Sequence, residues 1–202
     1  MPNKKKEIRL SGSGGQGLVL AGIILAEAAV LYDGKNAVQT QSYGPEARGG
    51  ASKSEVIISE EDIDYPKPEN LDILLCLTQE SYDEYHHDLK RGGVLIVDQD
   101  LVPDIFLRQH RTYRIPFTSI ASDQVGKKFV ANIVALGAIV AVTEVVSREA
   151  IVKAVMARVP KGTEQLNQRA LDAGFDAADK AQAEEPTKEE SPNGKNAGNH
   201  KT

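Results

Sequence analysis

The sequence has very few residues that could hold a metal through sulfur or form a cross-link. Its 202 residues include one cysteine, Cys76. A single cysteine excludes a disulfide within the chain. It also excludes a zinc or iron–sulfur site built from this chain's cysteines alone, because such sites take about four ligands. Cys76 lies in the apolar run 73–77, so we expect a small core residue and no metal site.

The chain also lacks long apolar runs and clusters of basic residues. The longest apolar run, 129–142, is short of the roughly 20 residues that span a bilayer. No apolar stretch of a secretory signal follows the N-terminal charges. The formal net charge is -5, and the single basic run, Lys4–Lys6, has the composition of a solvated tail. We expect a cytoplasmic protein that binds neither membrane nor nucleic acid.

Strand and helix patterns alternate in the first half of the chain, and helical patterns fill the second half. Strands are expected at residues 7–10, 37–42, 52–59, 71–77, 94–97 and 112–115. Helices are expected at residues 16–31, 78–89, 119–125, 129–144, 147–159 and 163–180. This order is typical of an α/β domain with a Rossmann-like, mostly parallel sheet flanked by helices, here with further C-terminal helices. We expect one domain at 7–180, a flexible basic start at 1–6 and a disordered charged tail at 181–202.

A glycine-rich turn follows the first expected strand and opens into an apolar helix. This order makes an anion-binding site, because bare backbone amides and the positive helix N-terminus face one ligand. Gly12, Gly14 and Gly17 have the spacing of a dinucleotide-binding fingerprint. That fingerprint needs an acidic residue at the end of the second strand, where this sequence has Gln41 and Ser42. The missing carboxylate disfavours NAD or FAD. A phosphate group, a partner chain and a purely structural tight turn stay open.

A second candidate is the glycine-rich loop 42–50, which follows the second strand. It carries a hydroxyl, a phenol, a carboxylate and a guanidinium on Ser42, Tyr43, Glu46 and Arg48. The loop should emerge at the same carboxyl edge of the sheet as the first turn, where open α/β sheets bind ligands. Arg48 could bind a carboxylate or phosphate with two parallel hydrogen bonds. The alternative is a Glu46–Arg48 surface pair on an ordinary loop.

Three other polar residues and one helix need an interpretation. Asn132 interrupts an apolar helix and, if buried, needs hydrogen-bond partners; the pattern favours bracing of a loop over contact with a ligand. His86 and His87 are adjacent on a helix and point about 100° apart, a poor metal chelate, so we expect surface histidines. The helix 129–142 is too apolar to be half exposed, so either this chain or another subunit covers it.

Several stretches together carry a family resemblance. They are Gly12–Gly17 (GSGGQG), Ala37–Gly50 (AVQTQSYGPEARGG), Gly92–Asp98 (GGVLIVD) and Val159–Glu164 (VPKGTE). This combination resembles the gamma subunit of 2-oxoacid:ferredoxin oxidoreductases, most closely that of the 2-oxoglutarate enzymes. The likeness covers about residues 6–178, and the tail after 181 is outside it.

The resemblance implies a Rossmann-like, non-redox subunit of a larger enzyme. In this family a 2-oxoacid is decarboxylated on thiamine diphosphate with Mg²⁺, electrons leave through iron–sulfur clusters to ferredoxin, and coenzyme A takes the acyl group. The cofactors are expected on alpha and beta subunits, with a ferredoxin-like delta subunit as a further candidate partner. No catalytic residue is expected here. The resemblance makes the two loops an interface or the coenzyme A side of the site, through Gly12, Gly14, Gly15, Gln16, Gly17, Ser42, Tyr43, Glu46 and Arg48.

Two other functions stay open at this point. A free-standing nucleotide-binding oxidoreductase would rest on the glycine turn alone. A scaffold or regulatory module would use both loops only for packing.

Overall fold

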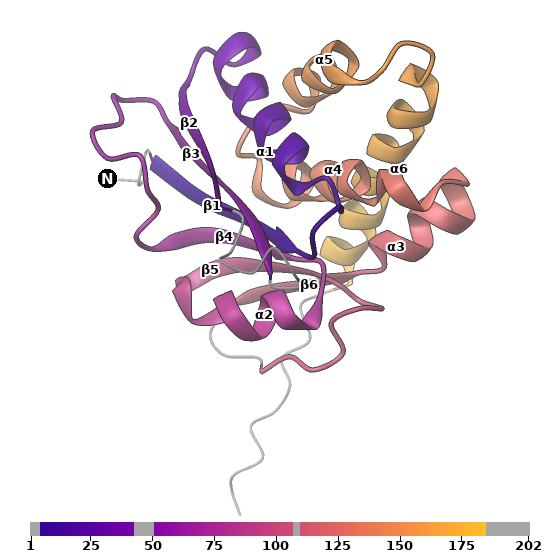
Figure 1. Ribbon diagram of the computed structural model, residues 1–202, viewed down its shortest axis with the longest axis horizontal. Coiled ribbons are helices and arrows are strands. Elements are labelled where there is room, and N and C mark those ends of the chain that lie inside the picture. Colours follow the sequence, from indigo (N-terminus) through magenta and orange to yellow (C-terminus); the bar gives the residue numbers. More distant parts are fainter. Residues whose placement is uncertain (1–4, 43–50, 107–109, 185–202) are drawn as a thin grey trace, which may run out of the picture.

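A computed structural model describes residues 5–42, 51–106 and 110–184 (Figure 1). These residues form one six-stranded sheet with the order β2-β3-β1-β4-β5-β6. The strands are β1 (Lys5–Gly12), β2 (Asn36–Ser42), β3 (Ser52–Ser59), β4 (Leu71–Cys76), β5 (Leu89–Asp98) and β6 (Arg111–Ile115). The helices are α1 (Leu18–Glu27), α2 (Gln79–Tyr85), α3 (Phe117–Ser119), α4 (Ala131–Thr143), α5 (Arg148–Arg158) and α6 (Glu164–Ala183). The predicted α/β class with a mostly parallel sheet is confirmed.

Strand β3 is the one described strand that runs against the others. It pairs antiparallel with both β1 and β2, whereas β1, β4, β5 and β6 pair in parallel. The connection 43–51 is shorter than the dozen or so residues that a parallel crossover needs, so β3 must return antiparallel to β2. Gly12 pairs with Ser52, and Ser42 pairs with Lys53. The carboxyl ends of β1 and β2 therefore lie at the same sheet edge, as predicted.

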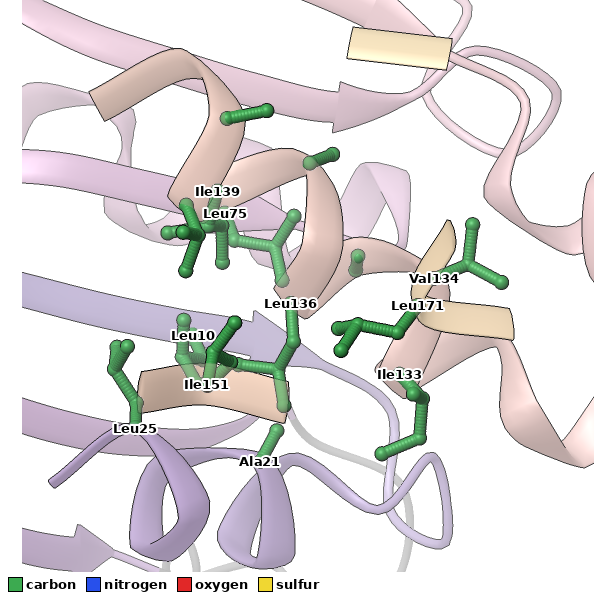
Figure 2. Close-up of a cluster of buried hydrophobic side chains, with 14 of the residues drawn as sticks. Leu10, Ala21, Leu25, Leu75, Ile133, Val134, Leu136, Ile139, Ile151 and Leu171 are labelled. Carbon is green, nitrogen blue, oxygen red and sulfur yellow. The ribbon is translucent and has the colours of Figure 1, made fainter. Parts of the chain in front are cut away.

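The helices cover the two faces of the sheet unequally. Helices α1, α4, α5 and α6 enclose the larger core on one face, while α2 covers a smaller core on the other. Figure 2 shows the larger core, where Leu10 and Leu75 of the sheet meet Leu25 of α1, Leu136 of α4 and Ile151 of α5. The described helices include none that is both long and apolar enough to cross a membrane.

Helix α4 is covered by this chain itself. Every residue from Asn132 to Val142 is buried. The approach of α6 is close enough to require glycines: a Cβ at Gly137 would lie 2.4 Å from the Leu171 carbonyl oxygen, and one at Gly174 would lie 2.0 Å from that of Val134. Burial within the chain is confirmed for residues 132–142 of this apolar run, whereas Phe129, before α4, is 70% exposed.

Two element boundaries differ from the prediction, and two caps agree with it. Helix α2 ends at Tyr85, followed by a 3₁₀ turn, and the Gly92–Gly93 pair lies inside β5. The register of β5 on β4 shifts here, so a bulge absorbs the two glycines and the strand begins earlier than expected. Thr78 and Ser147 cap α2 and α5 through their hydroxyl oxygens, as predicted.

The helical patterns at 16–31 and 119–125 are also confirmed, with a detail that periodicity does not show. Each continues beyond an α-helix as a π-helical turn, Ala28–Tyr32 after α1 and Ile120–Val125 after α3. The last helix runs to Ala183, so residues 181–183, which were predicted to belong to the disordered tail, are helical. The rest of the predicted tail, residues 185–202, lies outside the described residues.

Candidate functional site

The glycine turn joins the end of β1 to the start of α1, as the sequence predicts. Gly15 and Gly17 have φ angles of 84° and 73°, in the left-handed region that favours glycine. Gly17 is the residue before α1, and no side chain caps the helix there. The first amides of α1 are thus left for a ligand, solvent or another chain.

The side chain of Gln16 folds back over the turn. Its Oε1 accepts a hydrogen bond from the Ser13 backbone N–H at 2.7 Å. A Cβ at Gly12 would lie 2.2 Å from this Oε1, so the bare Gly12 leaves room for the amide. Gly14 and Gly15 face open space, with no atom within 4 Å of an added Cβ. An anion could approach Gly14 and Gly15 directly, but it could reach the Ser13 amide only after Gln16 swings out.

Asn132 braces the turn from α4. The residue is 6% exposed, and its Nδ2 donates to the Gly17 carbonyl oxygen at 3.2 Å. A Cβ at Gly17 would lie 2.5 Å from that Nδ2. The turn is therefore held between β1 and α4, and the expected bracing role of Asn132 is confirmed.

The second candidate loop is placed only at its two ends. Tyr43, Glu46 and Arg48 lie outside the described residues, and of Ser42 the backbone alone is described. Strand β2 ends at Ser42 with no acidic residue, which agrees with the missing dinucleotide carboxylate. The loop thus begins at the sheet edge where the glycine turn lies.

A buried ionic cluster on the α2 face was not found from the sequence. Arg9 donates from Nε to the Glu55 carboxylate at 2.8 Å and forms an ion pair with Asp88. Burial lowers the Arg9 pKa, but hydrogen bonds to Asp88 and Glu55 outweigh this and leave it raised. The Arg9 guanidinium lies 4.8 Å from the Tyr85 ring centre, and the Tyr85 hydroxyl donates to the Ala51 carbonyl at 3.4 Å. These contacts hold Ala51, the residue that follows loop 43–50, in place.

The sequence did contain a signal for this cluster. Charged residues at alternating positions of adjacent strands, Arg9 on β1 and Lys53 and Glu55 on β3, share one face of the sheet. The alternation at Lys53 and Glu55 was visible, but the pairing of β3 with β1 was not, so the sequence alone gave Arg9 no partner.

A cavity of about 380 Å³ opens on the α2 face, away from the glycine turn. Its lining includes Tyr82, His86, His87, Phe106 and His110. His87 is exposed, as predicted, while His86 is half-buried and stacks on the Tyr82 ring at 4.8 Å between ring centres. Burial lowers the pKa of His110 below its usual value, so this imidazole stays neutral near pH 7.

Comparison with known proteins places the chain in a family. Residues 7–177 match the family model described as pyruvate ferredoxin/flavodoxin oxidoreductase. The chain belongs to this family. It is 56% identical over 179 residues to the 2-oxoglutarate synthase subunit KorC of Methanocaldococcus jannaschii, covering 86% of this chain and 94% of that protein. The expected gamma-subunit resemblance is confirmed.

Solved structures of this family have the same fold. The gamma subunit of keto/oxoacid ferredoxin oxidoreductase from Geobacter sulfurreducens matches with a TM-score of 0.83 and 55% identity, over 89% of this chain and 99% of that one. The 2-oxoglutarate:ferredoxin oxidoreductase of Magnetococcus marinus matches with a TM-score of 0.78 and 23% identity. The match covers 88% of this chain and 32% of that chain, so there the same fold is one part of a longer polypeptide.

The resemblance implies Mg²⁺ and iron–sulfur clusters in the complex, and the described residues of this chain do not suit either. Cys76 is fully buried, and burial raises its pKa to about 12, so its thiol stays protonated. Within 5–42, 51–106 and 110–184, no three His, Cys, Asp or Glu residues gather closely enough to hold a metal ion. Among the described residues, the open backbone at Gly14 and Gly15 leaves room for a phosphate-bearing group.

Proposed function

We propose that this chain is the gamma subunit of a 2-oxoglutarate:ferredoxin oxidoreductase. The complex would decarboxylate 2-oxoglutarate oxidatively, form succinyl-CoA and CO₂ with coenzyme A, and pass the electrons to ferredoxin. The observation that carries the proposal is the 56% identity to a 2-oxoglutarate synthase subunit across 94% of that protein's length. Because the match spans 94% of the relative, it concerns that subunit as a whole and not one small part of it.

In this proposal the cofactors are divided among the subunits. Thiamine diphosphate, Mg²⁺ and the iron–sulfur clusters belong to alpha and beta subunits and to a ferredoxin-like delta subunit where one is present. The buried Cys76 and the poor fit of the described residues to a metal site support this division. This chain contributes a single domain at 7–180 and no catalytic residue. The complex acts in the cytoplasm, where ferredoxin is its electron acceptor.

The two loops at the carboxyl edge are proposed as the side of the subunit that faces coenzyme A and the active centre. The ends of β1 and β2 lie on either side of β3 at the same end of the sheet, which supports a shared role for Gly12 and the start of loop 42–50. The open backbone at Gly14 and Gly15 supports contact with a phosphate, and Gln16 would swing out to free the Ser13 amide. Tyr43, Glu46 and Arg48 would complete the site from the second loop.

The substrate assignment is tested on the native complex. Reduction of a viologen dye is measured with 2-oxoglutarate, pyruvate and a branched-chain 2-oxoacid, each with coenzyme A. We expect 2-oxoglutarate to give a kcat/KM at least about tenfold above the others, and the isolated chain to be inactive. Preference for another 2-oxoacid, or full activity of the isolated chain, would contradict the proposal.

The role of the turn is tested with a pair of variants in the complex. Gly14→Val fills open space, so the fold should tolerate it, while the KM for coenzyme A rises. Gln16→Ala removes the group that occupies the Ser13 amide, so the KM should stay the same or fall. Arg48→Ala tests the second loop in the same assay. If Gly14→Val and Arg48→Ala both leave the KM and kcat unchanged, the loops are structural.

A further inference from the structure

The cavity on the α2 face has a largely aromatic lining. Its volume of about 380 Å³ lies within the range of small-molecule sites, roughly 300–1,000 Å³. The described lining residues include no Lys, Arg, Asp or Glu; they are Tyr82, His86, His87, Leu89, Leu95, Phe106 and His110. Aromatic walls without a charged side chain suit an uncharged planar molecule better than an ion.

Two buried polar atoms beside this cavity have no hydrogen-bond partner. They are His110 Nδ1 and Thr112 Oγ1, and they are the buried side-chain atoms without a partner in residues 5–42, 51–106 and 110–184. His110 lines the cavity just before β6. Thr112 of β6 pairs in register with the lining residue Leu95, so both side chains are on the α2 face of the sheet. Buried polar atoms are nearly always hydrogen-bonded, so an unpaired atom beside a cavity indicates a ligand as its partner.

The other polar rings of the lining already have partners within the chain. His86 Nδ1 lies 2.9 Å from the Tyr82 carbonyl oxygen, which can only accept, so this nitrogen donates. His86 Nε2 lies 3.3 Å from His87 Nδ1. The Tyr82 hydroxyl oxygen accepts from the Phe106 backbone N–H at 2.8 Å. His110 Nδ1 is therefore the buried polar atom of the lining that remains for a ligand.

His110 presents this atom as a hydrogen-bond acceptor. Burial lowers its pKa, although a hydrogen bond with the Lys90 backbone opposes the shift, so the ring is neutral near pH 7. A neutral imidazole has one N–H, and a backbone contact that favours the charged ring takes this N–H. Because Nδ1 is the nitrogen without a partner, the proton is on Nε2 and Nδ1 keeps its lone pair. A ligand must therefore bring an N–H or O–H group.

We propose that this cavity binds an uncharged planar aromatic molecule of one or two rings that donates a hydrogen bond to His110 Nδ1. Phe106, which is 67% exposed at the cavity, presents a further aromatic ring for stacking. The proposal goes beyond the proposed function and does not depend on it, since none of the described lining residues belongs to the glycine turn.

The test uses the full-length chain and two probes, indole and 1-methylindole, in calorimetric titrations. Both probes are uncharged and planar, and indole alone has an N–H to donate. We expect indole to saturate one site per chain. 1-Methylindole should bind at least about tenfold more weakly, because it leaves the buried His110 Nδ1 without a partner.

Two variants separate the hydrogen bond from the size of the added methyl group. His110→Phe keeps a ring but removes the acceptor, so the two probes should bind within about twofold of each other. His87→Phe is the matched control, because this ring is exposed, and it should keep the preference for indole. A preference that persists in His110→Phe would come from the methyl group and would overturn the proposal, as would loss of the preference in His87→Phe.

A measurement on the wild type does not depend on the folding of any variant. In the chain labelled with ¹⁵N-histidine, the His110 Nδ1 resonance should shift when indole is added and shift much less with 1-methylindole. An unchanged His110 resonance, equal binding of the two probes, or no saturable binding of indole up to about 5 mM would each overturn the proposal.

Discussion

The two outer strands of the sheet, β6 and β2, differ in their charge. At one edge, β6 carries Arg111 and Arg114, both exposed, and an Arg114 N–H donates to the Val102 and Pro103 carbonyls at 3.4 and 3.3 Å. That guanidinium ties the segment after β5 to the edge strand. At the other edge, β2 has no charged residue. Charges on an edge strand discourage pairing with other chains. Of the two edge strands, β6 therefore carries the charges that discourage such pairing and β2 does not.

The apolar helices associated with the two edges differ in the same way. Helix α4 is buried throughout because α6, which also packs with Tyr113 and Ile115 of β6 in the larger core, covers it. Helix α1 is equally apolar, yet Leu20 on it and Leu31 just beyond it stay exposed. Apolar character alone therefore does not tell whether a helix is covered by its own chain. Substitutions on the two sides should accordingly have unequal effects, the largest where α4 and α6 meet.

The contact between α4 and α6 should not tolerate an added methyl group. Gly174→Ala would place a Cβ 2.0 Å from the Val134 carbonyl oxygen, where backbone cannot yield easily. We expect a loss of roughly 2–3 kcal/mol in the free energy of unfolding, measured by urea denaturation of the isolated chain. Gly14→Ala, which meets no atom within 4 Å, is the control and should change stability little. Equal stabilities for the two variants would show that α4 and α6 are not closely packed.

Edge strand β6 should become more mobile when Arg114 is replaced. Arg114→Ala deletes the hydrogen bonds to Val102 and Pro103, which should cost about 0.5–1.5 kcal/mol. Amide hydrogen exchange should accelerate in β6 and in residues 99–106, and stay unchanged in β2. Faster hydrogen exchange in β2, or no faster exchange anywhere, would contradict the idea that Arg114 holds the segment after β5 against β6.

Edge strand β2 should accept a charged side chain without loss of stability. Thr40→Lys puts a lysine in the middle of β2, where the side chain is half-exposed, and should alter the unfolding free energy by less than about 0.5 kcal/mol. A destabilised isolated chain would indicate that β2 is already covered within the monomer.

The smallest expected effect is a pH dependence beside β6. Burial lowers the His110 pKa from 6.5, so below that pH the unfolded chain binds more protons at this site than the folded chain. The contribution of neutral His110 to the free energy of unfolding is therefore fully present above the unfolded-state pKa and is lost as the pH falls. His110→Gln should narrow the difference in melting temperature between about pH 7.5 and about pH 5.5. An unchanged or wider difference would show that His110 does not titrate in this way.

Much of the local structure could be predicted from the sequence. Thr78 and Ser147 cap their helices through backbone groups only three residues away, so the pattern contains both partners. The run from Gly12 to Gly17 gave the strand, turn and helix order for the same reason. The predicted start of a strand at residue 94 was wrong, because the β-bulge that lets β5 begin at Leu89 depends on the neighbouring strand β4, which local sequence does not show.

The candidate site was predictable as a place on the sheet, but not in its contacts. The shared edge of the two loops followed from strand direction. The brace of Asn132 on Gly17 joins residues 115 positions apart, and the Arg9–Asp88 ion pair joins residues 79 apart. Such contacts depend on which elements become neighbours, and no local pattern encodes that.

The sequence by itself determined the α/β class, the glycine turn and the family resemblance, because periodicity, backbone sterics and capping act over a few residues. The tertiary structure alone decided that β3 lies between β2 and β1, that α4 is enclosed and that α1 is partly exposed. These outcomes depend on the packing of distant segments. An apolar helix becomes core where another element covers it, as α6 covers α4, and keeps exposed side chains where none of the described residues covers them.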